Sequence, residues 1–323
     1  MNLRIKLAAL TAIAAAAPAI ADVKLNDTFT TSGYVVGSYQ YDQPKGTTST
    51  DKFDLDAAKF LLSANLKPVT GTISFYHAPG APDNLTVLDA YATYDAGGGV
   101  SVTGGKFLSY LGYEAFDIPN MTQISYANGK FLGPIPGYHE GVRIDYADAE
   151  QSAGVALVDS VYSGSYYLKG DGELKHNAGF EAFYSYKGIK DLTIWAGAAY
   201  DTNGNVVHKD HDILTLDLWS QYQVTKEAYI AGEIVHKDGG LGDKGDDWLA
   251  ELGYTFTDKV SSVFRIGGEH VDNNGPIAVK YTVSPTYTLT PNLSVRAEYS
   301  YTAYTRYTSK SENFIGVQGI FKF

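Results

Sequence analysis

The connections between predicted strands constrain this chain more than any other feature of its sequence. Segments with period-two alternation of apolar and polar side chains, which is typical of β-strands, recur from residue 28 to the C-terminus. Seven connections of two to four residues alternate with eight connections of five or more, and both chain ends fall on the short side. Transmembrane barrels have short turns at one end and longer loops at the other, whereas a soluble β-sandwich has no reason to alternate in this way. The predicted fold is therefore an all-β, transmembrane antiparallel β-barrel with about 16 strands.

The predicted strands are bounded by turn residues or by the longer connections. They cover residues 28–41, 52–66, 69–77, 84–95, 99–107, 139–147, 151–160, 175–187, 191–201, 209–222, 227–236, 246–256, 259–270, 276–289, 292–304 and 312–323. The first and fourth of these alternate too poorly for a face to be assigned. Pro285 lies inside a predicted strand and indicates either a bulge or a misplaced boundary, because proline cannot donate to the ladder.

Alternation assigns an inner and an outer face to most strands. In residues 292–304, Leu293 and Tyr299 share one face, while Arg296 and Glu298 share the other. A Lys or Arg that faces lipid near the membrane midplane costs about 2–4 kcal/mol, so the polar face is predicted to line the lumen.

Aromatic residues support this orientation at the short-turn end of the barrel. Strands that run towards short turns end in residues predicted to face lipid: Tyr94, Tyr146, Tyr186, Tyr222, Tyr254, Tyr287 and Phe323. At a membrane boundary, tyrosine buries its ring while its hydroxyl stays hydrated. The short turns are predicted to be periplasmic and the longer loops extracellular.

The N-terminus predicts export. Residues 1–6 carry Arg4 and Lys6, residues 7–20 are apolar and uncharged, and small residues precede a cleavage point after Ala21. A transmembrane helix is the alternative, but the apolar run of roughly 14 residues is shorter than the ~20 needed to span a bilayer. Residues 1–21 are therefore predicted to be a cleaved signal peptide and residues 22–323 an outer-membrane β-barrel.

Composition narrows the function classes. The chain has no cysteine, which excludes disulfides, thiolate metal sites and thiol nucleophiles. Without the signal peptide it has 23 basic and 36 acidic residues, and this acidic balance argues against nucleic acid as a partner. Thirty-four glycines and 26 tyrosines suit a barrel with tyrosine girdles.

Three segments resemble known outer-membrane proteins. The ending ENFIGVQGIFKF resembles the terminal strand of Gram-negative outer-membrane barrels, which implies that Phe321 and Phe323 form an assembly signal read by the barrel assembly machinery. The segments KFLSYLGYEAFD (106–117) and GPIPGYHEGVRIDY (133–146) resemble the putative β-barrel porin-2 family. This resemblance implies an outer-membrane channel with no definite solute.

The connection 108–138 is about three times longer than most others and is the leading functional candidate. Its position after the fifth strand resembles the inward-folded constriction loop of sixteen-stranded porins. Folded inward, it would place polar, charged and aromatic side chains in the pore: Tyr110, Tyr113, Glu114, Asp117, Asn120, Lys130, Tyr138 and Glu140. Acids facing bases there would create a transverse field that favours small polar solutes. The alternative is an outside loop that packs on its neighbours.

Alternation also predicts charged residues on the lumen wall. They are Lys59, Arg143, Asp145, Glu181, Asp217, Glu233, Glu251, Arg265, Glu269, Lys280, Arg296 and Glu298. The excess of acids among them predicts a weak cation preference. The alternative is that many of these charges pair across the wall and serve only the fold, as the spacing of Arg143 with Asp145 and of Arg296 with Glu298 allows.

The predicted function is an outer-membrane porin, a water-filled channel for passive diffusion of small hydrophilic solutes or ions. A structural or adhesin-type barrel that binds an extracellular partner is the alternative, and an outer-membrane hydrolase is disfavoured because the chain lacks a G-x-S-x-G elbow. The expected partners are outer-membrane lipid, lipopolysaccharide, the assembly machinery and small hydrophilic solutes, and the resemblance to porins adds a homotrimer. Neither a cofactor nor an enzymatic activity is expected.

Two acidic loops are weak candidates for metal binding. Their ligand types suit divalent ions, but their spacing does not match an EF-hand loop. The residues are His208, Asp210, His211 and Asp212 in one loop, and Asp238, Asp243, Asp246 and Asp247 in the other. Solvated surface loops have the same composition by default, and bridging ions to lipopolysaccharide are a further alternative.

Overall fold

The computed structural model describes residues 23–77, 85–114, 116–132, 135–162, 174, 178–202, 212–239 and 244–323. The predicted signal peptide, residues 1–21, lies outside this set. The described residues form β-strands, their connections and one 3₁₀ turn, Ile118–Asn120. In the described part of the chain, no helix is long and apolar enough to cross a membrane.

All sixteen predicted strands are present, and each end lies within four residues of its predicted position. A short additional strand, β1 (Val23–Lys24), pairs with the start of β2. The others are β2 (Phe29–Pro44), β3 (Thr50–Leu66), β4 (Val69–His77), β5 (Thr86–Gly97), β6 (Val100–Leu108), β7 (Tyr138–Ala147), β8 (Gln151–Val158), β9 (Gly179–Tyr186), β10 (Leu192–Asp201), β11 (Ile213–Gln223), β12 (Ala228–Asp238), β13 (Gly245–Thr257), β14 (Val260–Val271), β15 (Ile277–Thr290), β16 (Leu293–Thr305) and β17 (Ser311–Lys322).

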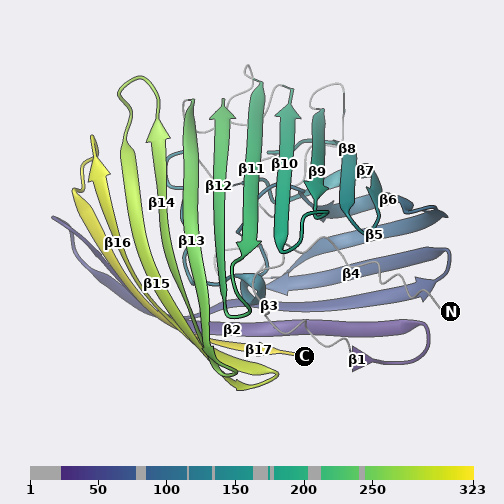
Figure 1. Cartoon of the computed structure of the whole chain (residues 1–323), viewed down its shortest axis with the longest axis horizontal. Helices are drawn as coiled ribbons and strands as arrows, with labels where there is room; N and C mark the ends of the chain where they lie inside the picture. Colours follow the sequence, from purple (N-terminus) through teal and green to yellow (C-terminus); the bar gives the residue numbers. More distant parts are fainter. Residues whose placement is uncertain are drawn as a thin grey trace.

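The sheet closes on itself. From β2 to β17, each strand pairs antiparallel with its neighbour in the chain, and β17 runs beside β2 to complete the barrel (Figure 1). The seam continues to the last residue, because Gly33 and Phe323 exchange backbone hydrogen bonds of 2.8 and 3.0 Å. Closure leaves no free edge along the seam, as a strand in lipid requires.

The outer face is apolar, as the alternation predicts. In β16, Leu293, Val295, Tyr299 and Tyr301 are exposed on one face, while Arg296 on the other face is buried. In the predicted aromatic ring, five members are exposed to the outside of the barrel: Tyr94, Tyr146, Tyr222, Tyr254 and Tyr287. The last two members, Tyr186 and Phe323, are half-buried.

Local irregularities explain the two strands whose faces the sequence left open. In β5, one extra residue opposite β4 shifts the register, so that the adjacent residues Leu88 and Asp89 are both buried. In β2, apolar residues occur on both faces, because Tyr34 and Val36 pack in a cluster on the inner side.

Pro285 marks neither a bulge nor a strand end, so both readings suggested by the sequence are wrong. β15 pairs Val283 with Tyr299 and next Thr286 with Arg296, which leaves a gap in the ladder without a change of register. The register shift of this pair of strands falls further on, between Thr288 and Thr290. The outer face of β15 tolerates the proline, because only one ladder donor is lost.

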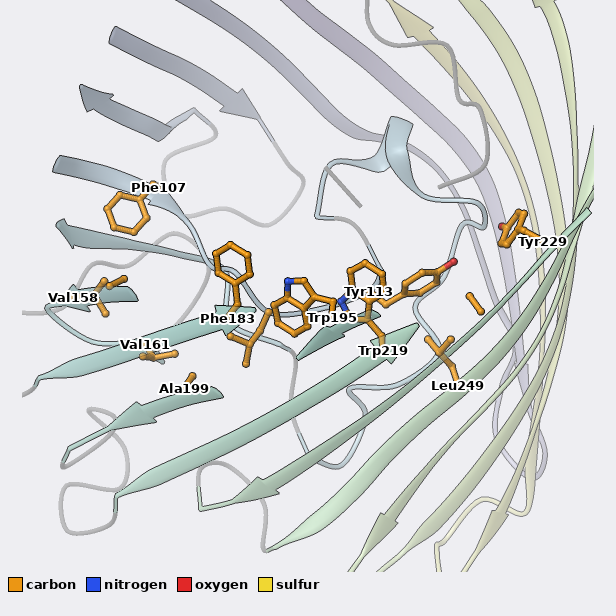
Figure 2. Close-up of a cluster of buried hydrophobic side chains, with 14 residues drawn as sticks. Phe107, Tyr113, Val158, Val161, Phe183, Trp195, Ala199, Trp219, Tyr229 and Leu249 are labelled. Atoms are coloured by element: carbon orange, nitrogen blue, oxygen red, sulfur yellow. The ribbon is translucent and has the colours of Figure 1, made fainter. Parts of the chain in front are cut away.

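The inner wall is less polar than predicted. Phe183, Trp195 and Trp219 come from β9, β10 and β11, and their rings stack in a row with centroids 6.0 and 5.8 Å apart (Figure 2). Tyr113, from the long connection after β6, meets Trp219 at 5.6 Å. These aromatic residues face inward and are buried because the long connection covers them.

Candidate channel constriction

The connection between β6 and β7, residues 109–137, crosses the inner side of the barrel. Its two ends are tied together where Ser109 donates its backbone N–H to the Gly137 carbonyl at 2.8 Å. From there it contacts wall side chains on the face opposite to the exposed apolar set, on strands all around the barrel. We call residues 109–137 the inner loop.

The first part of the inner loop binds carboxylates of β9, β11 and β12. The Ser109 hydroxyl donates to Glu181 at 2.5 Å. The backbone N–H of Gly112 donates to Asp217 at 2.8 Å, and that of Tyr113 donates to Glu233 at 2.6 Å. Successive wall acids therefore hold successive donors of the loop, first a hydroxyl and then two backbone amides.

The middle of the inner loop is held by β14, β15 and β16. Glu298 accepts hydrogen bonds from the backbone N–H of Ile124 at 2.5 Å and of Ser125 at 3.0 Å, and from the Ser125 hydroxyl. Arg265 donates to the Ser125 carbonyl at 2.9 Å, and Lys280 donates to the Ser125 hydroxyl at 2.6 Å. A single loop residue is thus fixed by three charged wall groups.

Arginines of the wall complete this anchorage. Arg265 forms an ion pair with Glu114, and Glu114 in turn accepts the backbone N–H of Ala127 at 2.8 Å. Arg296 donates to the Gln123 carbonyl at 3.0 Å.

The last part of the inner loop is fastened to one carboxylate. Glu269 accepts the backbone N–H groups of Lys130, Phe131 and Leu132 at 3.0, 2.9 and 3.3 Å. Such hydrogen bonds to a charged acceptor are worth roughly 1.5–3 kcal/mol each. The carboxylate therefore fixes three consecutive residues.

Lys130 ties the same segment to the extracellular side of the wall. Its ammonium group lies 2.7 Å from the Tyr304 hydroxyl and 2.9 Å from Glu312. Burial lowers the pKa of Lys130, but its hydrogen bonds to Tyr304 and Glu312 outweigh burial, so the pKa is raised overall and the ammonium stays charged.

The opposite wall holds the loop through Asp117. Lys59 on β3 lies 3.2 Å from the Asp117 carboxylate and 3.0 Å from Asp89. The Tyr34 hydroxyl also donates to Asp117 at 2.9 Å, and Lys59 reaches the Tyr138 hydroxyl at 3.1 Å. The inner loop is therefore bound on both sides of the barrel.

Two loop tyrosines lie deep in these contacts. The Tyr110 hydroxyl donates to Asp145 at 2.6 Å, and the Tyr113 hydroxyl donates to Gln221 at 3.1 Å. Burial, and secondly the charge of Glu251, hold the pKa of Tyr113 well above its usual value of 10. Tyr113 therefore stays a hydrogen-bond donor across the physiological pH range.

The structure places all twelve predicted wall residues on the inner face, and each contacts the inner loop. Most of the wall acids accept hydrogen bonds from amides of the inner loop. Arg143 and Asp145 form the cross-wall pair allowed by their spacing, at 3.2 Å. Arg296 and Glu298 instead bind different parts of the loop.

Among the eight predicted constriction residues, the predicted inward position is wrong for Glu140. It shares its strand face with Val142, Ile144 and Tyr146, which are exposed on the outside, so it lies on the outer and not the inner side. Glu140 pairs across the strands with Lys106 of β6 and lies where the pairing of β6 with β5 ends. Tyr110, Tyr113, Glu114, Asp117 and Lys130 all contact the wall, Tyr138 is buried against Lys59, and Asn120 ends the 3₁₀ turn.

Inward-facing glycines are the part of the site that sequence reasoning missed. A Cβ at Gly245, Gly267 or Gly316 would lie 2.8–3.0 Å from loop atoms of Leu132, Ala127 and Ile124, respectively. The sequence did contain an indication of these contacts, because a glycine on the predicted polar face of a strand indicates close approach of another backbone.

The two candidate metal loops bring no ligand set together in the described part of the chain, where no group of three or more His, Cys, Asp or Glu side chains could hold an ion. Asp238 lies 3.1 Å from Lys244, Asp246 lies 2.7 Å from His236, and Asp247 lies 3.1 Å from Lys237. The remaining described candidate, Asp212, accepts a hydrogen bond from Tyr200. The predicted ligands His208, Asp210, His211 and Asp243 lie outside the described residues.

A closed barrel with an apolar outer face, an aromatic ring and a loop bound across its inside defines an outer-membrane channel of the porin class. The family model of putative beta-barrel porin-2, OmpL-like proteins matches residues 28–323, and the chain belongs to this family. A comparison with curated protein sequences finds no match.

Solved structures with the same fold are outer-membrane proteins. The outer membrane channel DcaP of Acinetobacter baumannii has a TM-score of 0.67 and 13% identity, covering 91% of this chain and 97% of that one. The anion-selective porin from Comamonas acidovorans has a TM-score of 0.69 and 12% identity, covering 92% and 99%. OmpT of Vibrio cholerae in its trimer form has a TM-score of 0.60 and 13% identity, covering 92% and 100%. At these identities the likeness concerns the fold.

Proposed function

We propose that the protein is a porin for passive diffusion of small hydrophilic solutes or ions, and that the inner loop narrows its lumen. The observation that carries this proposal is the loop's attachment to inward-facing charges on both sides of a barrel whose outer face is apolar. Family membership supports the same function. The channel has no proposed catalytic role.

The experiment is single-channel recording of the purified protein in planar bilayers. Stable conductance steps support the proposal. A correctly inserted barrel that remains silent would contradict it.

We also propose a weak cation preference. Glu269 and Glu298 accept uncharged backbone N–H groups from the loop, so these hydrogen bonds leave the negative charge of both carboxylates in place. By contrast, the lumen bases Lys59 and Arg265 lie against the carboxylates of Asp117 and Glu114. Charged side chains that line a pore bias its selectivity towards the opposite sign.

Reversal potentials in a salt gradient test this preference. The expected sign is that of a modest cation selectivity, and it should decrease in the Glu269→Gln variant. Anion selectivity of the unmodified protein would reject the hypothesis.

We further propose that the chain is exported through a cleaved signal peptide, residues 1–21, and is inserted by the barrel assembly machinery, with Phe321 and Phe323 as its signal. In the membrane it would contact lipid and lipopolysaccharide. We propose a homotrimer as its assembled form, supported by the trimer form of OmpT among the solved structures with this fold.

A further inference from the structure

Arg143 is a base of the lumen wall whose charged end stays open to the lumen. It lies in the middle of β7 between Val142 and Ile144, which are exposed on the outside, so alternation turns it inward. Its Nε is buried and lies 3.2 Å from Asp145, although 22% of the side chain is exposed. The two terminal nitrogens of the guanidinium group are not buried, and they donate to no acceptor in the described part of the chain.

The other predicted wall bases use their charged ends within the protein. Lys59 and Arg265 form ion pairs with acids of the wall or of the inner loop. Lys280 and Arg296 donate to backbone carbonyls of the inner loop, at 2.9 and 3.0 Å. Arg143 therefore differs from these four bases in having donors left for a solute.

The guanidinium group of Arg143 is held in place on its other sides. The ring centroids of Phe107 and Tyr110 lie 4.7 and 5.5 Å from its central carbon. Asp145 lies against its Nε edge, and this carboxylate is itself fixed by the Tyr110 hydroxyl at 2.6 Å. An incoming group thus meets a side chain that is already oriented, which lowers the entropic cost of binding.

The open edge of this guanidinium group suits a carboxylate. Its two terminal nitrogens present parallel N–H donors in one plane, and these match the two oxygens of a carboxylate. An uncharged hydroxyl group makes weaker hydrogen bonds to the same donors. Asp145, beside the Nε edge, disfavours the second negative charge of a phosphate, so the edge favours a group with a single charge.

We propose that Arg143 is a binding site for small solutes that carry one carboxylate group. The site lies on β7 between Tyr138, where the inner loop ends, and Tyr146 of the aromatic ring. It rests on the proposed function, because solutes must enter the lumen to reach it. It is separate from the cation preference, since salt selectivity depends on the summed charge of the lumen, whereas the retention of a solute depends on one directional contact.

Single-channel recording with a matched pair of solutes tests this site. Gluconate and glucose are nearly equal in size, and only gluconate has a carboxylate. Gluconate should cause brief interruptions of the ionic current in the parent channel, whereas glucose at the same concentration should cause few. Equal interruptions by both solutes, or none with gluconate, would overturn the proposal.

Variants of Arg143 separate a directional contact from charge alone. In Arg143→Gln, the mean duration of a gluconate interruption should decrease at least about tenfold, as expected from the loss of a hydrogen bond to a charged group. Arg143→Lys keeps the charge but lacks the paired donors, so it should shorten the interruptions by a smaller factor.

The matched control is Lys52→Gln, which removes a charge from an exposed lysine near the start of β3 and should leave the duration unchanged. A stable conductance in salt alone shows that the barrel of each variant is intact. Parent-like interruptions in Arg143→Gln or in Arg143→Lys would reject the site.

A second readout keeps this proposal apart from the channel proposal. A parent protein that is silent in salt contradicts the channel, and binding is then measured by saturation-transfer NMR on the folded protein in detergent. Transfer to gluconate that exceeds transfer to glucose and is lost in Arg143→Gln supports the site. Transfer that persists in Arg143→Gln overturns it.

Discussion

Single glycines on the inner wall decide where the inner loop can lie. Gly316 is buried on β17, and a Cβ there would lie 2.8 Å from the Ile124 side chain. Gly319, on the same strand, faces outward, and nothing lies closer to its Cβ position than the Gly37 carbonyl at 3.9 Å. The two positions therefore form a natural pair for testing the loop's position.

Leucine at these positions should have different effects. Gly316→Leu overpacks the contact with Ile124, at a cost of about 1–3 kcal/mol, and should shift the loop and change the single-channel conductance. Gly319→Leu should leave the conductance unchanged, because its side chain meets lipid. If both variants conduct like the parent protein, the loop does not limit the pore.

At the scale of elements, the inner loop behaves as part of the wall and not as a free connection. It has little regular structure of its own, yet its amides are bound at intervals by carboxylates from β9, β11, β12, β14 and β16. A loop held in this way depends on the ionised state of its anchors, because a neutral acceptor binds an N–H more weakly.

Removing one anchor should loosen the loop locally. In Glu298→Gln, the loss of charge weakens the hydrogen bonds to Ile124 and Ser125, each worth roughly 1.5–3 kcal/mol with a charged acceptor. Hydrogen exchange of the amides of residues 123–125 should accelerate by about tenfold or more, which corresponds to ~1.4 kcal/mol. Glu227→Gln, in a short turn, is the charge-matched control and should leave these amides protected. Unchanged exchange in Glu298→Gln would show that Glu298 does not hold the loop.

For the whole molecule, closure depends on the seam between the first and last barrel strands. Phe323 exchanges two backbone hydrogen bonds with Gly33, and its ring lies over Gly33 so closely that a Cβ there would be 2.7 Å from it. The end of the chain therefore completes both the ladder and the outer surface at the seam.

Deletion of Phe323 should reduce assembly more than conduction. The seam loses two hydrogen bonds and the ring contact, so the fraction of heat-modifiable, folded barrel in outer membranes should decrease several-fold. Molecules that do insert should conduct normally, because the contacts of Phe323 are with Gly33 and Phe321 at the seam. Recovery of folded barrel at the parent level would contradict this role of the terminal residue.

The sequence by itself determined the strand number, the faces of most strands, the aromatic ring and the inward position of all twelve charged wall residues. These properties follow from period-two alternation and turn lengths, which are local and can be read along the chain. The alternation and the turn lengths also located the long connection after the fifth barrel strand.

Only the tertiary structure decided what these residues touch. The loop anchors join residues that are far apart in the chain, such as Gly112 with Asp217, 105 positions apart, and Ile124 with Glu298, 174 positions apart, and no local period encodes such contacts. The same reason explains the inner aromatic row of Phe183, Trp195 and Trp219, which is buried because the inner loop covers it. The contacts of the lumen charges are decided by this one folded-in segment, whose path depends on the closed barrel around it.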